Sequence, residues 1–117
     1  MNSHWISLTR PEDLQEAIEA SHEKPVVIFK HSYRCSISIM AAHQMRLLEA
    51  DLIGRYFIDV ITHRASSMAL AQLSGVQHES PQALLYVKGQ LVWSGSHGEV
   101  RADLLQAKYR QALTSTT

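Results

Sequence analysis

Hydrophobic and polar residues follow one another in blocks that predict alternating strands and helices. Short apolar runs at residues 5–8, 26–29, 56–61, 83–87 and 90–94 are typical of strands. Apolar positions at spacings of three and four predict helices over about residues 11–21, 35–52, 66–73 and 99–113. The predicted order of elements is therefore β-α-β-α-β-α-β-β-α.

Several residues indicate where these elements begin and end. Thr9 offers a hydroxyl to cap the first helix, whose first turn contains Pro11. Gly54 and Gly75 are expected to end the second and third helices. Lys88-Gly89 predicts a tight turn between the last two strands. The alternation favours an α/β fold: a mostly parallel central sheet with helices on both faces and an antiparallel C-terminal hairpin.

Length and charge narrow the class of protein. A chain of 117 residues is expected to form a single domain over residues 1–117. Eleven basic and eleven acidic residues cancel, so neither nucleic acid nor an anionic membrane is an expected partner. No apolar run reaches the roughly 20 residues of a membrane span, and no signal sequence is evident, so we expect a cytoplasmic protein.

Seven histidines raise the question of a bound metal. None of them forms an i, i+4 pair on a helical pattern, and the chain has no pair of cysteines at zinc-binding spacing. We therefore predict no metal site and no bound cofactor.

Cys35 is the only cysteine, and it lies where the apolar strand pattern of residues 26–29 gives way to the longest helical pattern. A thiol at a helix N-terminus faces unpaired N–H groups and the positive end of the helix dipole, and both favour the thiolate. A single cysteine cannot form an intrachain disulfide, which agrees with a reducing compartment. The alternative is that Cys35 is a small apolar residue of the core.

Three neighbours of Cys35 extend the candidate site. A guanidinium at Arg34 and a protonated imidazole at His31 would both stabilise a thiolate, unless Arg34 is only a solvated loop charge. Ser38 stands where a dithiol redox enzyme would place its second cysteine, one helical turn beyond the first. Its hydroxyl can hydrogen-bond the sulfur or satisfy a local backbone group, but it cannot attack a disulfide.

The order of elements resembles that of the thioredoxin fold, in which the redox cysteine opens the helix after the first central strand. Residues 30–38, Lys-His-Ser-Tyr-Arg-Cys-Ser-Ile-Ser, and residues 76–82, Val-Gln-His-Glu-Ser-Pro-Gln, resemble two motifs of the YtxJ family of thioredoxin-like general stress proteins, also called monothiol bacilliredoxins. Residues 23–26 and 89–97 are similar as well, so the resemblance covers nearly the whole chain.

This resemblance implies a function, and it implies which residues lie opposite Cys35 in the site. Cys35 would attack the mixed disulfide of an S-thiolated protein and remove a low-molecular-weight thiol such as bacillithiol, and an external thiol system would regenerate it. Pro81 would be a cis-proline facing the cysteine, with the Ser80 backbone exposed to an extended thiol ligand. Some members have proline where this chain has Ser36, which keeps an N–H group, and an aromatic residue where it has Gly98.

Two other classes of function stay open at this point. The domain could be a redox-inactive binding or adaptor module that uses the cleft between Cys35 and Pro81, since fold does not settle function. A carrier of iron–sulfur clusters with one cysteine per subunit has less support, because the sequence offers no second ligand.

Overall fold

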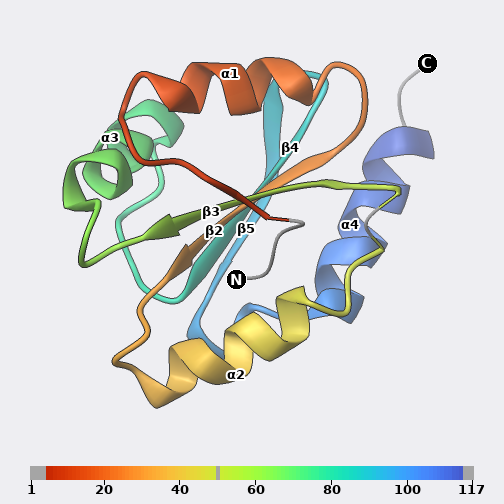
Figure 1. Cartoon of the computed structure of the whole chain (residues 1–117). Helices are drawn as coiled ribbons and strands as arrows, with labels where there is room; N and C mark the ends of the chain where they lie inside the picture. Colours follow the sequence, from red (N-terminus) through yellow and green to blue (C-terminus); the bar gives the residue numbers. More distant parts are fainter. Residues whose placement is uncertain (1–4, 50, 115–117) are drawn as a thin grey trace.

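The computed structural model describes residues 5–49 and 51–114, and Figure 1 shows how their elements are arranged. The elements are β1 (Ile6–Ser7), α1 (Asp13–Ala20), β2 (Val26–His31), α2 (Ser36–Met45), β3 (Gly54–Asp59), α3 (Arg64–Ser74), β4 (Gln82–Val87), β5 (Gln90–Ser96), the short 3-10 helix η1 (His97–Glu99) and α4 (Ala102–Thr114). Apart from η1, this is the order that the sequence predicts.

The strands form one sheet in the order β1-β3-β2-β4-β5. β1, β3 and β2 are parallel, whereas β4 is antiparallel to both of its neighbours, β2 and β5. Only β4 therefore runs against the other strands, and the predicted mostly parallel sheet with a C-terminal hairpin is confirmed. In the hairpin turn, Lys88 and Gly89 have φ values of 53° and 79°, which fits the tight turn predicted there.

Helices cover both faces of the sheet, with α1 and α3 on one side and α2 and α4 on the other (Figure 1). Successive residues of a strand point to opposite faces, so Val27 and Phe29 pack in the cluster with α2 and α4, while Val26 and Ile28 pack with α1 and α3. Burial of β2 on both faces explains its unbroken apolar sequence.

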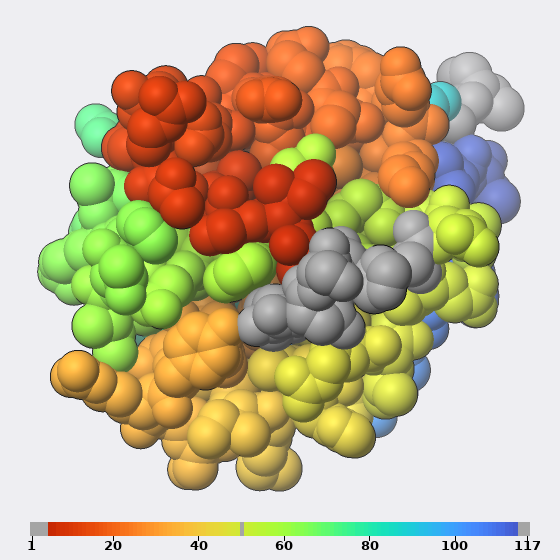
Figure 2. Space-filling model, in the orientation of Figure 1, coloured from red at the N-terminus to blue at the C-terminus, as the bar shows by residue number. Residues whose placement is uncertain are grey.

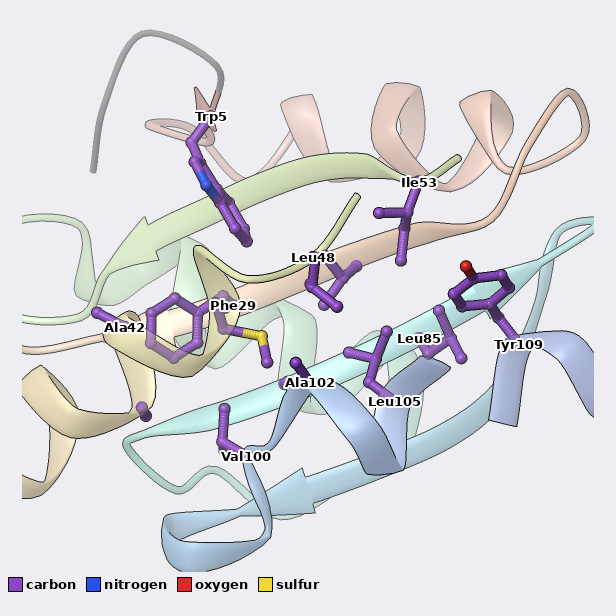
Figure 3. Close-up of a cluster of buried hydrophobic side chains, with 14 of the residues drawn as sticks. Trp5, Phe29, Ala42, Leu48, Ile53, Leu85, Val100, Ala102, Leu105 and Tyr109 are labelled. Atoms are coloured by element: carbon purple, nitrogen blue, oxygen red, sulfur yellow. The ribbon is translucent and has the colours of Figure 1, made fainter. Parts of the chain in front are cut away.

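The core on the α2 and α4 side is drawn in Figure 3. Leu85 of the sheet lies beside Leu105 of α4, whereas Phe29 lies next to Ala42 of α2. Because Leu105 is completely buried, α4 is held to the sheet mainly through this apolar face.

The first helix begins later than predicted. Glu12, not Thr9, is its N-cap residue. Residues 10–13 form a closed turn around this position. The Asp13 N–H donates to the Arg10 carbonyl at 3.0 Å, and the Asp13 carboxylate accepts from the Arg10 N–H at 3.3 Å. This closed turn takes the place of the cap predicted at Thr9.

The second helix ends at Met45, earlier than the predicted residue 52. Leu47 donates to the Gln44 carbonyl and Leu48 to the Met45 carbonyl, at 3.0 and 3.2 Å, so the chain continues in tighter turns that direct Leu48 into the core. Gly54 does not end this helix but begins β3, and position 50 lies outside the described residues. Gly75, by contrast, caps α3 with a φ of 76°, as predicted.

Side-chain hydrogen bonds shift two further boundaries. β3 ends at Asp59, two residues before the predicted end, because the Asp59 carboxylate accepts the N–H groups of Ile61 and Thr62 at 3.1 Å each. The last helix begins at Ala102 rather than at residue 99, and its first N–H donates to Gln44 Oε1 of α2 at 3.0 Å. A residue far away in the sequence thus caps α4.

Within the described parts of the chain, no helix combines the length and the hydrophobicity that crossing a bilayer requires.

The core cluster predicts a contrast between two adjacent leucines of α4. We expect Leu105→Ala to lower the free energy of unfolding by about 2–5 kcal/mol, because it leaves a cavity under the sheet. Leu104 is 41% exposed, so Leu104→Ala should cost less than about 1 kcal/mol. Urea denaturation of both variants measures the difference, and equal losses would contradict the assignment of the buried face.

Candidate functional site

Cys35 stands at the N-terminal end of α2 and is partly exposed. Its backbone is extended, with φ −111° and ψ 124°, and its carbonyl accepts the N–H of Ile39 at 3.1 Å. Its own N–H donates to the Ser32 carbonyl at 3.3 Å. Cys35 is therefore the N-cap residue, and the unpaired N–H groups of the first turn lie at the same end of the helix as its thiol. The predicted place of the thiol at a helix start is confirmed.

The hydroxyl of Ser38 is buried and joins α2 to the end of β2. Ser38 Oγ accepts the N–H of Ser32 at 2.9 Å and lies 3.0 Å from His31 Nδ1. Among the described residues, this hydroxyl makes no hydrogen bond to Cys35. Of the two roles considered for Ser38, the structure therefore has the second, the satisfaction of a local backbone group.

His31 is buried at the end of β2 rather than presented to the thiol as a cation. Its ring stacks on Phe29 with ring centroids 5.3 Å apart and meets the edge of Tyr33 at 4.2 Å. Burial lowers the pKa of His31 below its usual 6.5, so the imidazole is neutral at pH 7. The lowered pKa disfavours the cation through which His31 would stabilise a thiolate, and its described contacts are packing and a hydrogen bond.

Arg34 and Ser36 flank Cys35 and are both exposed. The Arg34 N–H lies 3.4 Å from Ser32 Oγ within the turn, and its side chain lies in solvent, where salt screens its charge. Ser36 is the first residue of α2, where its N–H belongs to the unpaired groups of the first turn.

Ser80 and Pro81 lie at the start of β4, and the peptide bond between them is cis. Lys30 of β2 pairs with Gln82 of β4, so Pro81 lies at the edge of the sheet where β2 ends and the loop to Cys35 begins. The Pro81 carbonyl accepts the N–H of His97 at 2.8 Å, which ties this edge to η1. The fold therefore brings the two separated sequence motifs to one edge.

Lys30, in β2, points away from the thiol side and is completely buried. Its Nζ lies 3.1 Å from His78 Nδ1, and Ser67 Oγ of α3 lies 3.2 Å from the same nitrogen. Burial lowers the pKa of Lys30 to about 8. The sequence pattern did not indicate this contact of Lys30 with His78. A lysine that ends the apolar run Val-Val-Ile-Phe was the available signal.

A groove of about 620 Å³ lies between α2 and η1, and its lining does not include Cys35 or Pro81. Ile37, Met40 and Val100 supply apolar lining, and Ile37 and Met40 are well exposed. Gly98 also lines the groove, and a Cβ added there would meet no atom within 4 Å. In the space-filling view, α2 forms the lower edge of the molecule (Figure 2). An apolar surface thus lies along the helix that carries Cys35.

No group of three or more His, Cys, Asp or Glu side chains in residues 5–49 and 51–114 is placed to hold a metal ion. His4 lies outside these residues.

Comparisons with known proteins agree with this geometry. A family model described as "Monothiol bacilliredoxin BrxC" matches residues 6–105. A solved structure described as a candidate oxidoreductase with a thioredoxin fold is 32% identical, with a TM-score of 0.80 over 89% of this chain and 92% of that one.

Two thioredoxins are similar in fold alone. Mitochondrial thioredoxin 3 from Saccharomyces cerevisiae is 18% identical, with a TM-score of 0.71 over 94% of this chain and 99% of that one. The thioredoxin of Trypanosoma brucei brucei is 10% identical, also with a TM-score of 0.71, over 94% of this chain and 91% of that one. The predicted thioredoxin fold is thereby confirmed.

Loss of the Ser38 hydroxyl should destabilise the site. In Ser38→Ala the buried N–H of Ser32 has no acceptor, and we expect a loss of about 1–3 kcal/mol in the free energy of unfolding. Ser36→Ala, at an exposed position in the same turn, is the matched control and should change this free energy by less than about 0.5 kcal/mol. Urea unfolding compares the two variants, and equal midpoints would contradict a stabilising role of the Ser38 hydroxyl.

Burial of Lys30 predicts a dependence of stability on pH. Its pKa is about 8 in the folded chain and ordinarily 10.5, so between these values the unfolded chain binds a proton that the folded chain has released. The free energy of unfolding should therefore rise by up to about 3 kcal/mol from pH 8 to 10.5, relative to Lys30→Met. Between pH 7 and 8 the difference should change little, since His78 titrates below this range. Denaturant curves of both proteins across this range give the measurement, and a flat difference throughout would contradict it.

Proposed function

Since the chain belongs to the monothiol bacilliredoxin family, with a match over residues 6–105, we propose that it removes a low-molecular-weight thiol such as bacillithiol from S-thiolated proteins. The observation that carries this proposal is the partly exposed Cys35, the only thiol of the chain, at the N-terminus of α2. The family and the fold support a thiol-redox function, and the identity of the small thiol is the part that we propose.

The reaction is a thiol–disulfide exchange in two steps. The Cys35 thiolate attacks the small thiol's sulfur in the mixed disulfide, and the client protein leaves as a thiolate that takes a proton from water. Cys35 then carries the small thiol as a new disulfide. An external thiolate attacks that disulfide, forms a bond with the small thiol and releases Cys35. No net oxidation of the domain occurs over the cycle.

The surroundings of Cys35 support these two reaction steps. Ser38 occupies the place of a resolving thiol, and its hydroxyl is bound to Ser32 and His31, so the second step requires a thiol from outside. The Ser80–Pro81 edge offers a backbone wall for an extended ligand, and the groove along α2 offers apolar surface for the client protein. Because the cycle needs a reduced Cys35, we propose that it operates in the cytoplasm, during oxidative stress.

A second candidate is the redox-inactive binding module. Its expected site was the cleft between Cys35 and Pro81, whereas the groove that supports a protein partner is lined by α2 and η1 and contains neither residue. In that case the thiol is dispensable, and Cys35→Ser would bind the same partner with unchanged affinity. Under the first proposal the same substitution abolishes de-thiolation.

The test uses a purified protein that carries bacillithiol on a single cysteine. Incubation with the reduced domain should transfer the adduct, so that intact-mass analysis finds the mass of bacillithiol on Cys35 and the free thiol on the client. We expect Cys35→Ser to leave the rate at its uncatalysed value. A parallel reaction with a glutathionylated client identifies which small thiol is preferred, and transfer no faster than with free cysteine would refute the proposal.

A further inference from the structure

The buried contact between Lys30 and His78 lies outside the thiol site and has no part in the exchange reaction described above. Lys30 Nζ is 3.1 Å from His78 Nδ1, and Lys30 is completely buried on the sheet face covered by α1 and α3. Among the described residues, no carboxylate forms an ion pair with it. A buried ammonium group that pairs with a neutral ring, and not with a carboxylate, destabilises a fold. Stability alone therefore does not explain a lysine at position 30.

The chemistry of the contact defines the state of His78. An ammonium group can only donate, so Nδ1 is the acceptor and the ring is neutral, with its proton on Nε2. Ser67 Oγ lies 3.2 Å from the same nitrogen. Burial lowers the pKa of His78, the charges of Lys30 and Arg64 lower it further, and Glu79 opposes them. The contact is therefore intact at neutral pH and is lost when His78 takes up a proton.

His78 belongs to residues 76–81, which join α3 to β4 without forming a helix or strand. Besides the bonds at His78, this segment is held by contacts with β4 and η1. Gln82 Nε2 donates to the Gln77 carbonyl at 3.0 Å. The His97 N–H donates to the Pro81 carbonyl at 2.8 Å, and Glu79 Oε2 lies 3.4 Å from His97 Nε2. The segment ends in Ser80 and Pro81, at the edge of the sheet that also carries the loop to Cys35.

We propose that Lys30 is a positioning residue for thiol exchange, because through His78 it holds residues 76–80 so that the Ser80–Pro81 backbone stays at the site of Cys35. This inference rests on the proposed function of Cys35. A methionine at position 30 fills a similar volume without a charge or a donor, so stability and positioning can be separated by one substitution.

The experiment compares Lys30→Met with Lys24→Met, which removes an exposed lysine. In Lys30→Met we expect the exchange rate with an S-thiolated protein to fall at least about tenfold, while alkylation of Cys35 by iodoacetamide changes less than about twofold. The midpoint of urea unfolding should stay the same or rise. Lys24→Met should leave all three measurements unchanged.

Two further readouts do not depend on activity. NMR titration should show a higher His78 pKa in Lys30→Met, because a neighbouring positive charge is gone. The NMR order parameters of the backbone amides of residues 77–80 should fall, because the segment has lost one of its bonds and moves more. A pH profile of thiol exchange adds a third readout. In the unmodified protein, the rate of thiol exchange divided by the rate of Cys35 alkylation should decline as His78 protonates below pH 6.5. This decline should be absent from Lys30→Met.

The outcomes separate this inference from the proposed function. If Lys30→Met exchanges thiols at the original rate, or if the rate falls only in proportion to a loss of stability, Lys30 is not a positioning residue. If the unmodified protein does not remove the adduct at all, the proposed function fails. The NMR order parameters of residues 77–80 then still decide whether Lys30 holds the segment, and unchanged values there overturn the inference.

Discussion

β4 pairs antiparallel with β2 in a register that places Lys30 beside Gln82, and the rest of the candidate site depends on this pairing. It brings the end of β2, from which the chain turns toward Cys35, to the edge where Pro81 begins the next strand. Both strands are buried on every residue, so a shift by one position would exchange the side chains that pack on the two faces of the sheet. The register is thereby tied to the two cores, and the cores in turn locate the site.

Around the thiol, short polar contacts hold the backbone in place. Ser38 binds the Ser32 N–H and His31, the Pro81 carbonyl accepts from His97, and Gln44 caps α4. The two ionisable side chains at the end of β2, Lys30 and His31, are also buried. Burial lowers the pKa values of both Lys30 and His31, which lie on opposite faces of the sheet. The described residues therefore offer one partly exposed thiol on a frame of buried polar groups.

Local pattern predicted the order of the elements, the turn at Lys88-Gly89 and the cap at Gly75, because glycine conformation and side-chain periodicity act within a few residues. It failed where a distant or bulky partner intervened. α4 begins at Ala102 because Gln44 of α2 accepts its first N–H. His31 is stacked on Phe29 in a buried position that the sequence pattern does not reveal.

The sequence by itself determined that one cysteine opens a helix after a buried strand, that no second thiol can resolve its disulfide, and that a serine-proline pair precedes the fourth strand. These are facts of residue identity and local spacing. Only the tertiary structure decided that Ser38 faces His31 rather than the sulfur, and that Lys30 reaches His78 from β2. Contacts between residues 48 positions apart, as in that last pair, depend on strand register and burial, which no local pattern contains.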